Sequence, residues 1–159
     1  MKNKLFADIN WVNRSSSQLN ARRNLPFMAR RLFQSGDKTV HDRSSPKMLH
    51  SFRLLGKQMR YLLEFLQFCY PSRLQEQISE MKRLQDHLGA ISDCRTTTRI
   101  LQEARLSELP ETFHFKRYLD RKAQEHTQAF IDYWMENLGR KDVQTRWIDH
   151  LAGSKESNV

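Results

Sequence analysis

The stretch SPKMLHSFRLLGKQMRYLLEFL, residues 45–66, decides the expected fold. Ser45 is a good N-cap, and Pro46 suits the first helical position, where its missing N–H is not needed. Apolar residues then recur at steps of three and four, as they do on one face of a helix. The stripe consists of Met48, Phe52, Leu55, Met59, Leu62 and Leu66. These features predict an amphipathic helix that ends near Tyr70, just before Pro71.

The opposite side of this helix carries the basic file, the name we give to His50, Arg53, Lys57 and Arg60. Their spacing stacks them on successive turns over about 15 Å, and Glu64 follows on the same side. Like charges placed in this way repel one another by a few tenths of a kcal/mol each. We therefore expect an anion to neutralise them.

The same side also carries the apolar row, which consists of Leu54, Tyr61, Phe65 and Phe68. An exposed basic face is not normally flanked by four large apolar groups. Two interpretations stay open at this point. Either the last long helix of the chain covers the row, or a second layer of protein packs on it and leaves the cations in a lined groove.

The same periodicity predicts further helices, and no segment shows the alternation of a strand. The expected helices span about residues 8–34, 45–70, 72–105, 110–138 and 143–151. Pro26 should kink or divide the first, and Gly36 should stop it and open a loop over residues 35–45. Ser72 can cap the third, and Gly139 should end the fourth. The predicted fold class is all-α: an antiparallel four-helix bundle over residues 1–140, then a short fifth helix and a disordered tail over 141–159.

The third and fourth helices have core stripes of their own. These are Leu74, Ile78, Met81, Leu84, Leu88 and Ile91 on the third, and Phe115, Leu119, Ala123, His126, Phe130 and Tyr133 on the fourth. The second stripe makes His126 a core histidine rather than a ligand. Another face of the third helix holds Lys82, Asp86, Gly89 and Asp93. Because glycine disfavours a helix interior, Gly89 should permit a close approach, either of a ligand or of a neighbouring helix.

The net charge of +9, from 27 Lys and Arg against 18 Asp and Glu in 159 residues, is concentrated in one segment. Between Arg14 and Arg60 lie eleven basic residues and two acidic ones, Asp37 and Asp42. A clustered excess indicates an electrostatic footprint for a polyanion. Charged residues make up 28% of the chain, and only five glycines and four prolines are present, which excludes a collagen-like chain and a low-complexity linker.

Location can be predicted from the same composition. Asp8 and Asn10 interrupt the apolar run that a signal peptide needs, and the stretch YLLEFLQFCY is too short to span a bilayer. Cys69 and Cys94 cannot form a disulfide framework. We expect a soluble cytoplasmic protein without membrane association.

The basic file is followed by MKRLQDHLGAISD, residues 81–93, and preceded by two ARR triplets at 21–23 and 29–31. Together these resemble the CHAD family, the conserved-histidine α-helical domain, over about residues 15–138. The matching residues are His50, Arg53, Lys57, Arg60, Tyr61, Leu84, Gln85, Asp86, Leu88, Gly89 and Asp93. The resemblance implies an all-helical domain that binds inorganic polyphosphate in a basic cavity. It implies no catalysis and no cofactor.

On this resemblance, the candidate polyphosphate ligands are His50, Arg53, Lys57, Arg60, Lys82, Arg22, Arg23, Arg30 and Arg31. Tyr61, Glu64 and Asp86 are expected to support or orient them. Arginine and lysine contact phosphate oxygens through charge-assisted hydrogen bonds. A histidine beside the anion gains a proton more easily, so binding should strengthen as the pH falls. The family also implies association with polyphosphate granules.

Two features depart from the family pattern. Gln58 stands where the family usually has another arginine, which should weaken the site modestly. The family's domain also normally contains two similar halves, and this chain resembles the second alone. We expect two copies of the chain to associate through the apolar row and rebuild the two-half arrangement, unless another protein supplies the missing half.

Other functions compete with this interpretation. A nucleic-acid-binding module would use the same basic file, although Trp11, Trp134 and Trp147 are too scattered to form a platform for bases. A histidine phosphotransfer protein would use His50, but Leu54 lies one turn after it, where a small residue is favoured. We find no glycine-rich phosphate loop, no nucleophile elbow and no metal-ligand spacing among the six histidines. The sequence therefore predicts a binding protein rather than an enzyme.

Overall fold

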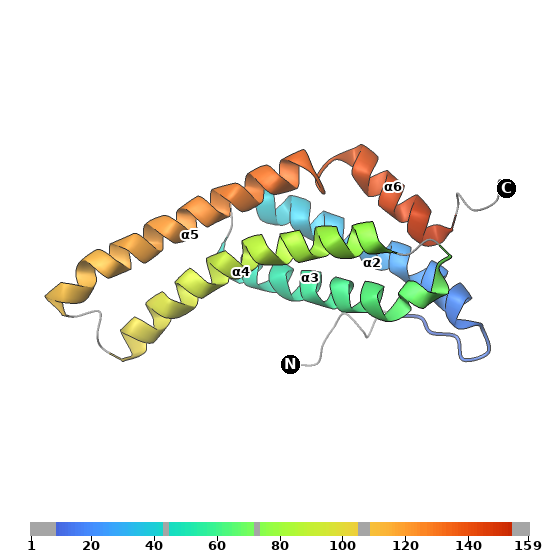
Figure 1. Ribbon diagram of the computed structural model, residues 1–159, viewed down its shortest axis with the longest axis horizontal. Coiled ribbons are helices and arrows are strands. Elements are labelled where there is room, and N and C mark those ends of the chain that lie inside the picture. Colours follow the sequence, from blue (N-terminus) through green and yellow to red (C-terminus); the bar gives the residue numbers. More distant parts are fainter. Residues whose placement is uncertain (1–8, 43–44, 72–73, 105–108, 154–159) are drawn as a thin grey trace.

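The computed structural model describes residues 9–42, 45–71, 74–104 and 109–153. It contains α2 (Ser17–His41), α3 (Pro46–Leu66), the 3-10 turn η1 (Gln67–Cys69), α4 (Gln75–Glu103), α5 (Pro110–Glu136) and α6 (Lys141–Ala152) (Figure 1). No strand occurs among these residues. The prediction of an all-α fold with four long helices and a short fifth one is confirmed.

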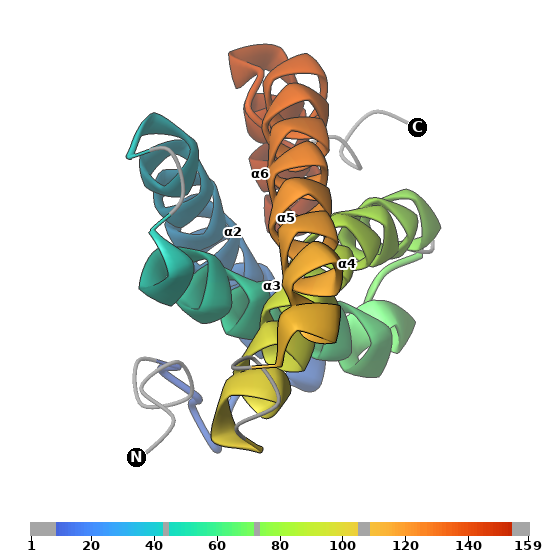
Figure 2. The same ribbon diagram turned by 90° about the vertical axis from the view of Figure 1, so that its left-hand side faces the viewer.

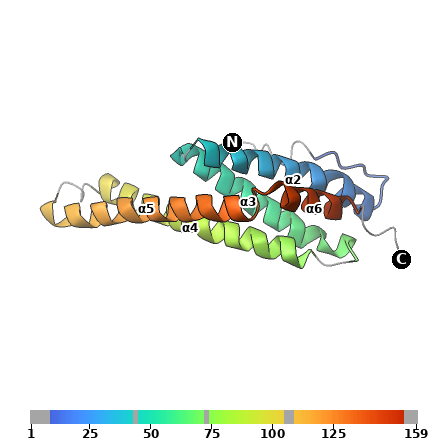
Figure 3. The same ribbon diagram turned by 90° about the horizontal axis from the view of Figure 1, so that it is seen from above.

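The helices pack as a bundle from which one pair protrudes. Seen end-on, α2 and α4 lie on opposite sides of α5 (Figure 2). The end of α4 and the beginning of α5 run side by side past the ends of α2 and α3 (Figures 1 and 3). We call these two segments, residues 95–103 and 110–124, the arm. Leu119 is the only buried side chain among the arm's described residues, so the arm adds little to the core.

An aromatic cluster joins the helices of the bundle. Trp134 of α5 meets the ring of Phe52 edge-on at a centroid distance of 5.3 Å, and Trp147 of α6 meets Phe33 of α2 at 5.6 Å. Both tryptophans are buried, and each indole N–H has a carboxylate acceptor. Trp134 Nε1 donates to Asp37 Oδ1 at 2.9 Å, and Trp147 Nε1 donates to Glu80 Oε2 at 2.6 Å. These contacts fix α5 and α6 on the other three helices.

The first helix differs from its prediction at both ends. Asp8 lies outside the described residues, and residues 9–16 are not helical. Ser16 is the N-cap of α2, where its hydroxyl accepts the Leu19 N–H at 3.2 Å. Pro26 lies buried inside α2 and does not divide it. A local cap therefore sets the start of this helix, although apolar periodicity begins before it.

The loop predicted from Gly36 is wrong, because α2 continues through Gly36 to His41. A Cβ at this position would lie 2.1 Å from Cη2 of Trp134. The glycine therefore makes room for a tryptophan of α5 and does not stop the helix. A local stop signal cannot be told from a packing requirement without knowledge of that distant ring.

The predicted core stripes hold to different degrees. All six residues of the α4 stripe are buried, as expected. The stripe on α3 is rotated toward Leu49, Gly56 and Leu63, which are buried, whereas Met48, Leu55 and Leu62 are only half-buried. The rotation brings α3 against α4, where the Gln85 amide donates to the Gly56 carbonyl at 3.3 Å. It also sets the position of the basic file.

The C-terminal part of the chain is close to its prediction. The helix expected at 143–151 is confirmed as α6, and its Val143, Trp147 and Leu151 are buried in the same core as α2 to α5. α5 ends at Glu136, and the Gly139 N–H donates to the Trp134 carbonyl at 2.7 Å. Ser72, the expected cap of α4, lies outside the described residues. Two residues of the core stripe expected on α5 are not in the core: Phe115 is exposed and His126 is half-buried.

Candidate anion-binding groove

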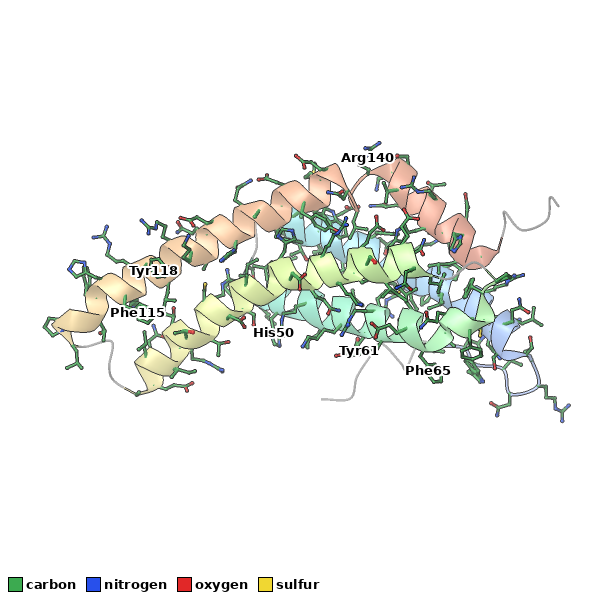
Figure 4. The ribbon with its side chains drawn as sticks, viewed as in Figure 1. His50, Tyr61, Phe65, Phe115, Tyr118 and Arg140 are labelled. Atoms are coloured by element: carbon green, nitrogen blue, oxygen red, sulfur yellow. The ribbon has the colours of Figure 1, made fainter. Side chains whose placement is uncertain are left out.

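The outer surface of α3 presents two parallel strips rather than one mixed face. The apolar row lies in the most exposed position, with Leu54 at 43% and Phe68 of η1 at 70% exposed. Three residues of the basic file, Arg53, Lys57 and Arg60, are half-buried instead, and His50 and Arg53 lie next to α4. Figure 4 shows Tyr61 and Phe65 along the edge of α3 that faces away from α5. The last long helix therefore does not cover the apolar row, and the first of the two interpretations is wrong.

A groove of about 490 Å³ lies between the beginning of α3 and the second half of α4. His50 and Arg53 enter it from α3, and Arg95 and Arg99 enter it from α4. The remaining polar lining residues are Ser92, Asp93 and Thr96. Leu49, Leu88 and Ile91 provide an apolar wall. The groove thus combines three arginines and a histidine with two hydroxyl groups and a single carboxylate, which is a suitable set for an anion.

Several cations of the groove and the file have no partner among the residues that the structure describes. Among the described residues, His50, Arg53 and Lys57 form no hydrogen bond and no ion pair. Burial lowers the pKa of the Arg95 guanidinium, which nevertheless remains charged at neutral pH. A charge that is partly removed from water and unpaired is costly, so an external anion would stabilise this arrangement.

Arg60 at the far end of the file is held in place by its neighbours. Its Nη1 donates to Glu64 Oε1 at 3.1 Å, and its guanidinium lies 4.9 Å from the centroid of the Tyr61 ring. Glu64 and Tyr61 thus lie where the sequence analysis expected orienting residues. Asp86, the third residue of that group, is exposed and forms no ion pair within the described part of the chain.

The four arginines of α2 do not line the groove. Arg22 lies at the other end of the bundle, where a Cβ on Gly153 would be 2.8 Å from its Cζ. Arg23 and Arg30 are exposed, and Arg31 lies over the ring of Phe27 at 5.9 Å. Lys82 is exposed on α4. The structure therefore brings His50 and Arg53 together with α4 residues and leaves the α2 arginines apart.

A family model described as the CHAD domain matches residues 5–102 of the chain, which is more than half of its length. The chain belongs to the CHAD family. The match includes all of α2 and α3 and all but the last residue of α4, so both walls of the groove lie within the CHAD match. α5 and α6 lie outside it, whereas the sequence analysis extended the resemblance to about residue 138. Comparisons with curated proteins and with solved structures found no significant match.

Two groove residues of this CHAD protein, Arg95 and Arg99, were missed in the sequence analysis. The sequence did contain a sign of Arg95. This residue continues the core stripe of α4 one turn beyond Ile91, at a position where an apolar residue would be expected. A cation in that position marks the point where the core ends and the groove begins. Arg99 follows one further turn along α4, and its Nε lies 3.8 Å from Glu103 Oε1.

Gly89 lies on α4 one turn before Ser92 and Asp93 of the groove. A Cβ at this position would meet no atom within 4 Å. Packing between helices of this chain therefore does not require the glycine, and that explanation of it is wrong.

The described residues hold neither of two further kinds of site. No group of three His, Cys, Asp or Glu side chains there could hold a metal ion. Nor does any helix in that part of the chain combine the length and apolar character needed to cross a membrane.

Proposed function

We propose that this protein binds inorganic polyphosphate along the basic file and in the groove, and catalyses no reaction. The observation that carries the proposal is the convergence of Arg53, Arg95 and Arg99 with His50 in one groove, within the part of the chain that matches the CHAD domain. The continuation of the file over Lys57 and Arg60 suits an extended, repeating anion rather than a single phosphate. Repeated fixed charges, not a reactive group, are what such a ligand requires.

Charge reversal tests the site directly. Arg53→Glu combined with Lys57→Glu should weaken the binding of long-chain polyphosphate by roughly a hundredfold or more, because each lost charged hydrogen bond is worth about 1.5–3 kcal/mol. Isothermal titration calorimetry measures this change. Arg140→Glu with Arg146→Glu is the matched control, since it makes the same change in net charge on two exposed residues, the N-cap of α6 and a residue within that helix. Equal losses in the two variants would contradict the assignment of the site.

The rival functions make different predictions for the same protein. A nucleic-acid-binding module would prefer single- or double-stranded DNA to polyphosphate in a gel-shift competition. A histidine phosphotransfer protein would acquire acid-labile phosphate on His50 after incubation with a phosphodonor. We expect polyphosphate to compete best, its binding to weaken steeply with salt, and His50 to remain unmodified.

The proposal includes pairing of two copies through the apolar row. Its four side chains are between 43% and 70% exposed, and Phe65 and Phe68 already form an edge-on pair at 6.3 Å. The row runs beside the basic file, so pairing would bring two files together. Their mutual repulsion would be relieved by a polyanion, and polyphosphate should therefore promote the dimer.

Light scattering tests this part. We expect a mass near twice the 19.0 kDa of the chain when polyphosphate is present, and Leu54→Lys with Phe65→Lys should return the monomer. A monomer in both conditions would refute the pairing, and it would favour a different protein as the source of the second half.

We place polyphosphate binding by this protein in the cytoplasm, where Cys69 and Cys94, free in this fold, would stay reduced.

A further inference from the structure

The arm carries aromatic side chains that its own packing does not use. Phe113, Phe115 and Tyr118 of α5 are 56%, 45% and 46% exposed. Figure 4 shows Phe115 and Tyr118 near the beginning of α5, far from His50, Tyr61 and Phe65. These residues also lie beyond the region that matches the CHAD domain. Neither the family nor the proposed groove accounts for them.

Two of the rings are nearly parallel, and arginines lie beside the aromatic side chains. Phe115 and Tyr118 have nearly parallel rings, with an angle of 11° between their planes and 6.4 Å between their centroids. The guanidinium of Arg121 lies 5.7 Å from the Tyr118 centroid, and that of Arg117 lies 5.9 Å from the Phe113 centroid. Arg117 and Arg121 also line a hollow of about 250 Å³ with His114 and Tyr118.

The charge around this hollow is mainly positive. Glu125 pairs with Lys122 at 2.7 Å and with Arg121 at 3.6 Å. Asp120 lines a different groove, between α4 and α5. Arg117 has no ion pair with any described residue, and its guanidinium lies beside the Phe113 ring. The surface thus offers exposed rings for stacking and cations for phosphates on the same two turns of helix.

We propose that this surface, the platform formed by Phe115, Tyr118, Arg117 and Arg121, binds single-stranded nucleic acid. Bases would stack on the two rings, and the backbone phosphates would contact the two arginines. Duplex DNA does not fit, because its bases are already stacked on one another. Inorganic polyphosphate has no rings and would gain nothing from Phe115 and Tyr118. An acidic peptide could use the arginines but has no bases to stack on the rings.

The experiment measures oligonucleotide binding to the platform separately from binding to the basic file. The Arg53→Glu/Lys57→Glu variant serves as the starting protein, so that the result does not depend on the proposed polyphosphate site. Fluorescence anisotropy compares a labelled oligo(dT) with an abasic oligonucleotide of the same length. We expect oligo(dT) to bind at least about tenfold more tightly, since both carry the same phosphates and only one carries bases.

Removing the rings should abolish that difference. In the same starting protein, Phe115→Ala with Tyr118→Ala should weaken oligo(dT) binding roughly tenfold or more and leave the abasic strand nearly unaffected. Phe27→Ala is the control, because it deletes an exposed phenyl ring from α2, away from the platform and from the apolar row. This control should leave the preference for oligo(dT) intact. Tyr118→Trp keeps a ring in place, and the emission of this added indole, taken as the difference from the starting protein with its three native tryptophans, should be quenched when oligo(dT) binds.

Several results would overturn the proposal. Equal affinity for oligo(dT) and the abasic strand would show that bases are not recognised. Displacement of oligo(dT) by poly-glutamate at equal charge concentration would identify an acidic protein surface as the partner instead. A change of mass in light scattering on removing Phe115 and Tyr118 would show that a second copy covers the rings. If the alanine variant fails to fold, as judged by circular dichroism, an unquenched Tyr118→Trp protein is the result that refutes stacking.

Discussion

Gly36→Ala tests the contact on which the packing of α2 against α5 depends. An added Cβ would lie 2.1, 2.2 and 2.7 Å from three carbons of the Trp134 ring. The ring cannot move freely, because it is fully buried, meets Phe52 edge-on, and donates its N–H to Asp37. The substitution therefore forces either the ring or helix α2 to shift.

The size of the effect follows from three contributions. Overpacking of a well-filled core costs about 1–3 kcal/mol. Weakening the indole hydrogen bond to a carboxylate destabilises the fold by about a further 1.5 kcal/mol. The better helix propensity of alanine stabilises it by about 1 kcal/mol. We expect a net loss of about 2–3 kcal/mol in the free energy of unfolding. In urea, this corresponds to a fall of about 1 M in the midpoint.

Gly89→Ala is the matched control for this experiment. Gly89 is also inside a long helix, but a Cβ there would meet nothing within 4 Å. Helix propensity then acts alone, and the free energy of unfolding should rise by about 0.5–1 kcal/mol. Urea unfolding monitored by circular dichroism measures both variants. If Gly36→Ala is as stable as the parent, the Trp134 ring does not lie against α2 as described. Partial recovery of the free energy of unfolding in Gly36→Ala/Trp134→Phe would support the contact between Gly36 and the Trp134 ring.

Three further predictions address other parts of the molecule. Gly153 ends α6 in the left-handed region at φ 76°, so Gly153→Ala should lower the free energy of unfolding by about 1–2 kcal/mol. An unchanged melting temperature would contradict the role of Gly153 as the C-cap. Burial lowers the pKa of His87 below its ordinary 6.5. The stabilisation from neutral His87 is therefore complete above pH 6.5, and it is lost as the pH falls through the lowered pKa of the folded protein. His87→Gln should therefore flatten the fall of the free energy of unfolding below pH 6.5 in denaturant titrations at several pH values, and a fall parallel to that of the parent would contradict this role of His87. Glu64→Gln removes the carboxylate that pairs with Arg60 at 3.1 Å and should raise polyphosphate affinity by roughly twofold to fivefold in calorimetry, whereas weaker binding would mean that Glu64 serves mainly to position Arg60.

Much of the helical framework could be predicted from local sequence. The start of α3 at Pro46, the six buried residues of the α4 stripe and the short helix α6 all follow from caps, periodicity and breakers. These signals act over one or two turns, so they survive without knowledge of the rest of the chain. The motif around His50 and Arg53 was sufficient to indicate the family, because its spacing is itself local.

The sequence by itself determined that this chain forms helices and that one of them carries a file of cations. Only the tertiary structure decided that α2 continues through Gly36, because the reason is a tryptophan on α5. It also decided that His50 and Arg53 of the file join Arg95 and Arg99 of α4 in a groove, while the apolar row stays exposed. Helix periodicity reports which residues share a side of one helix. Which neighbouring helix meets that side depends on packing between residues far apart in the chain, and no local pattern contains that information.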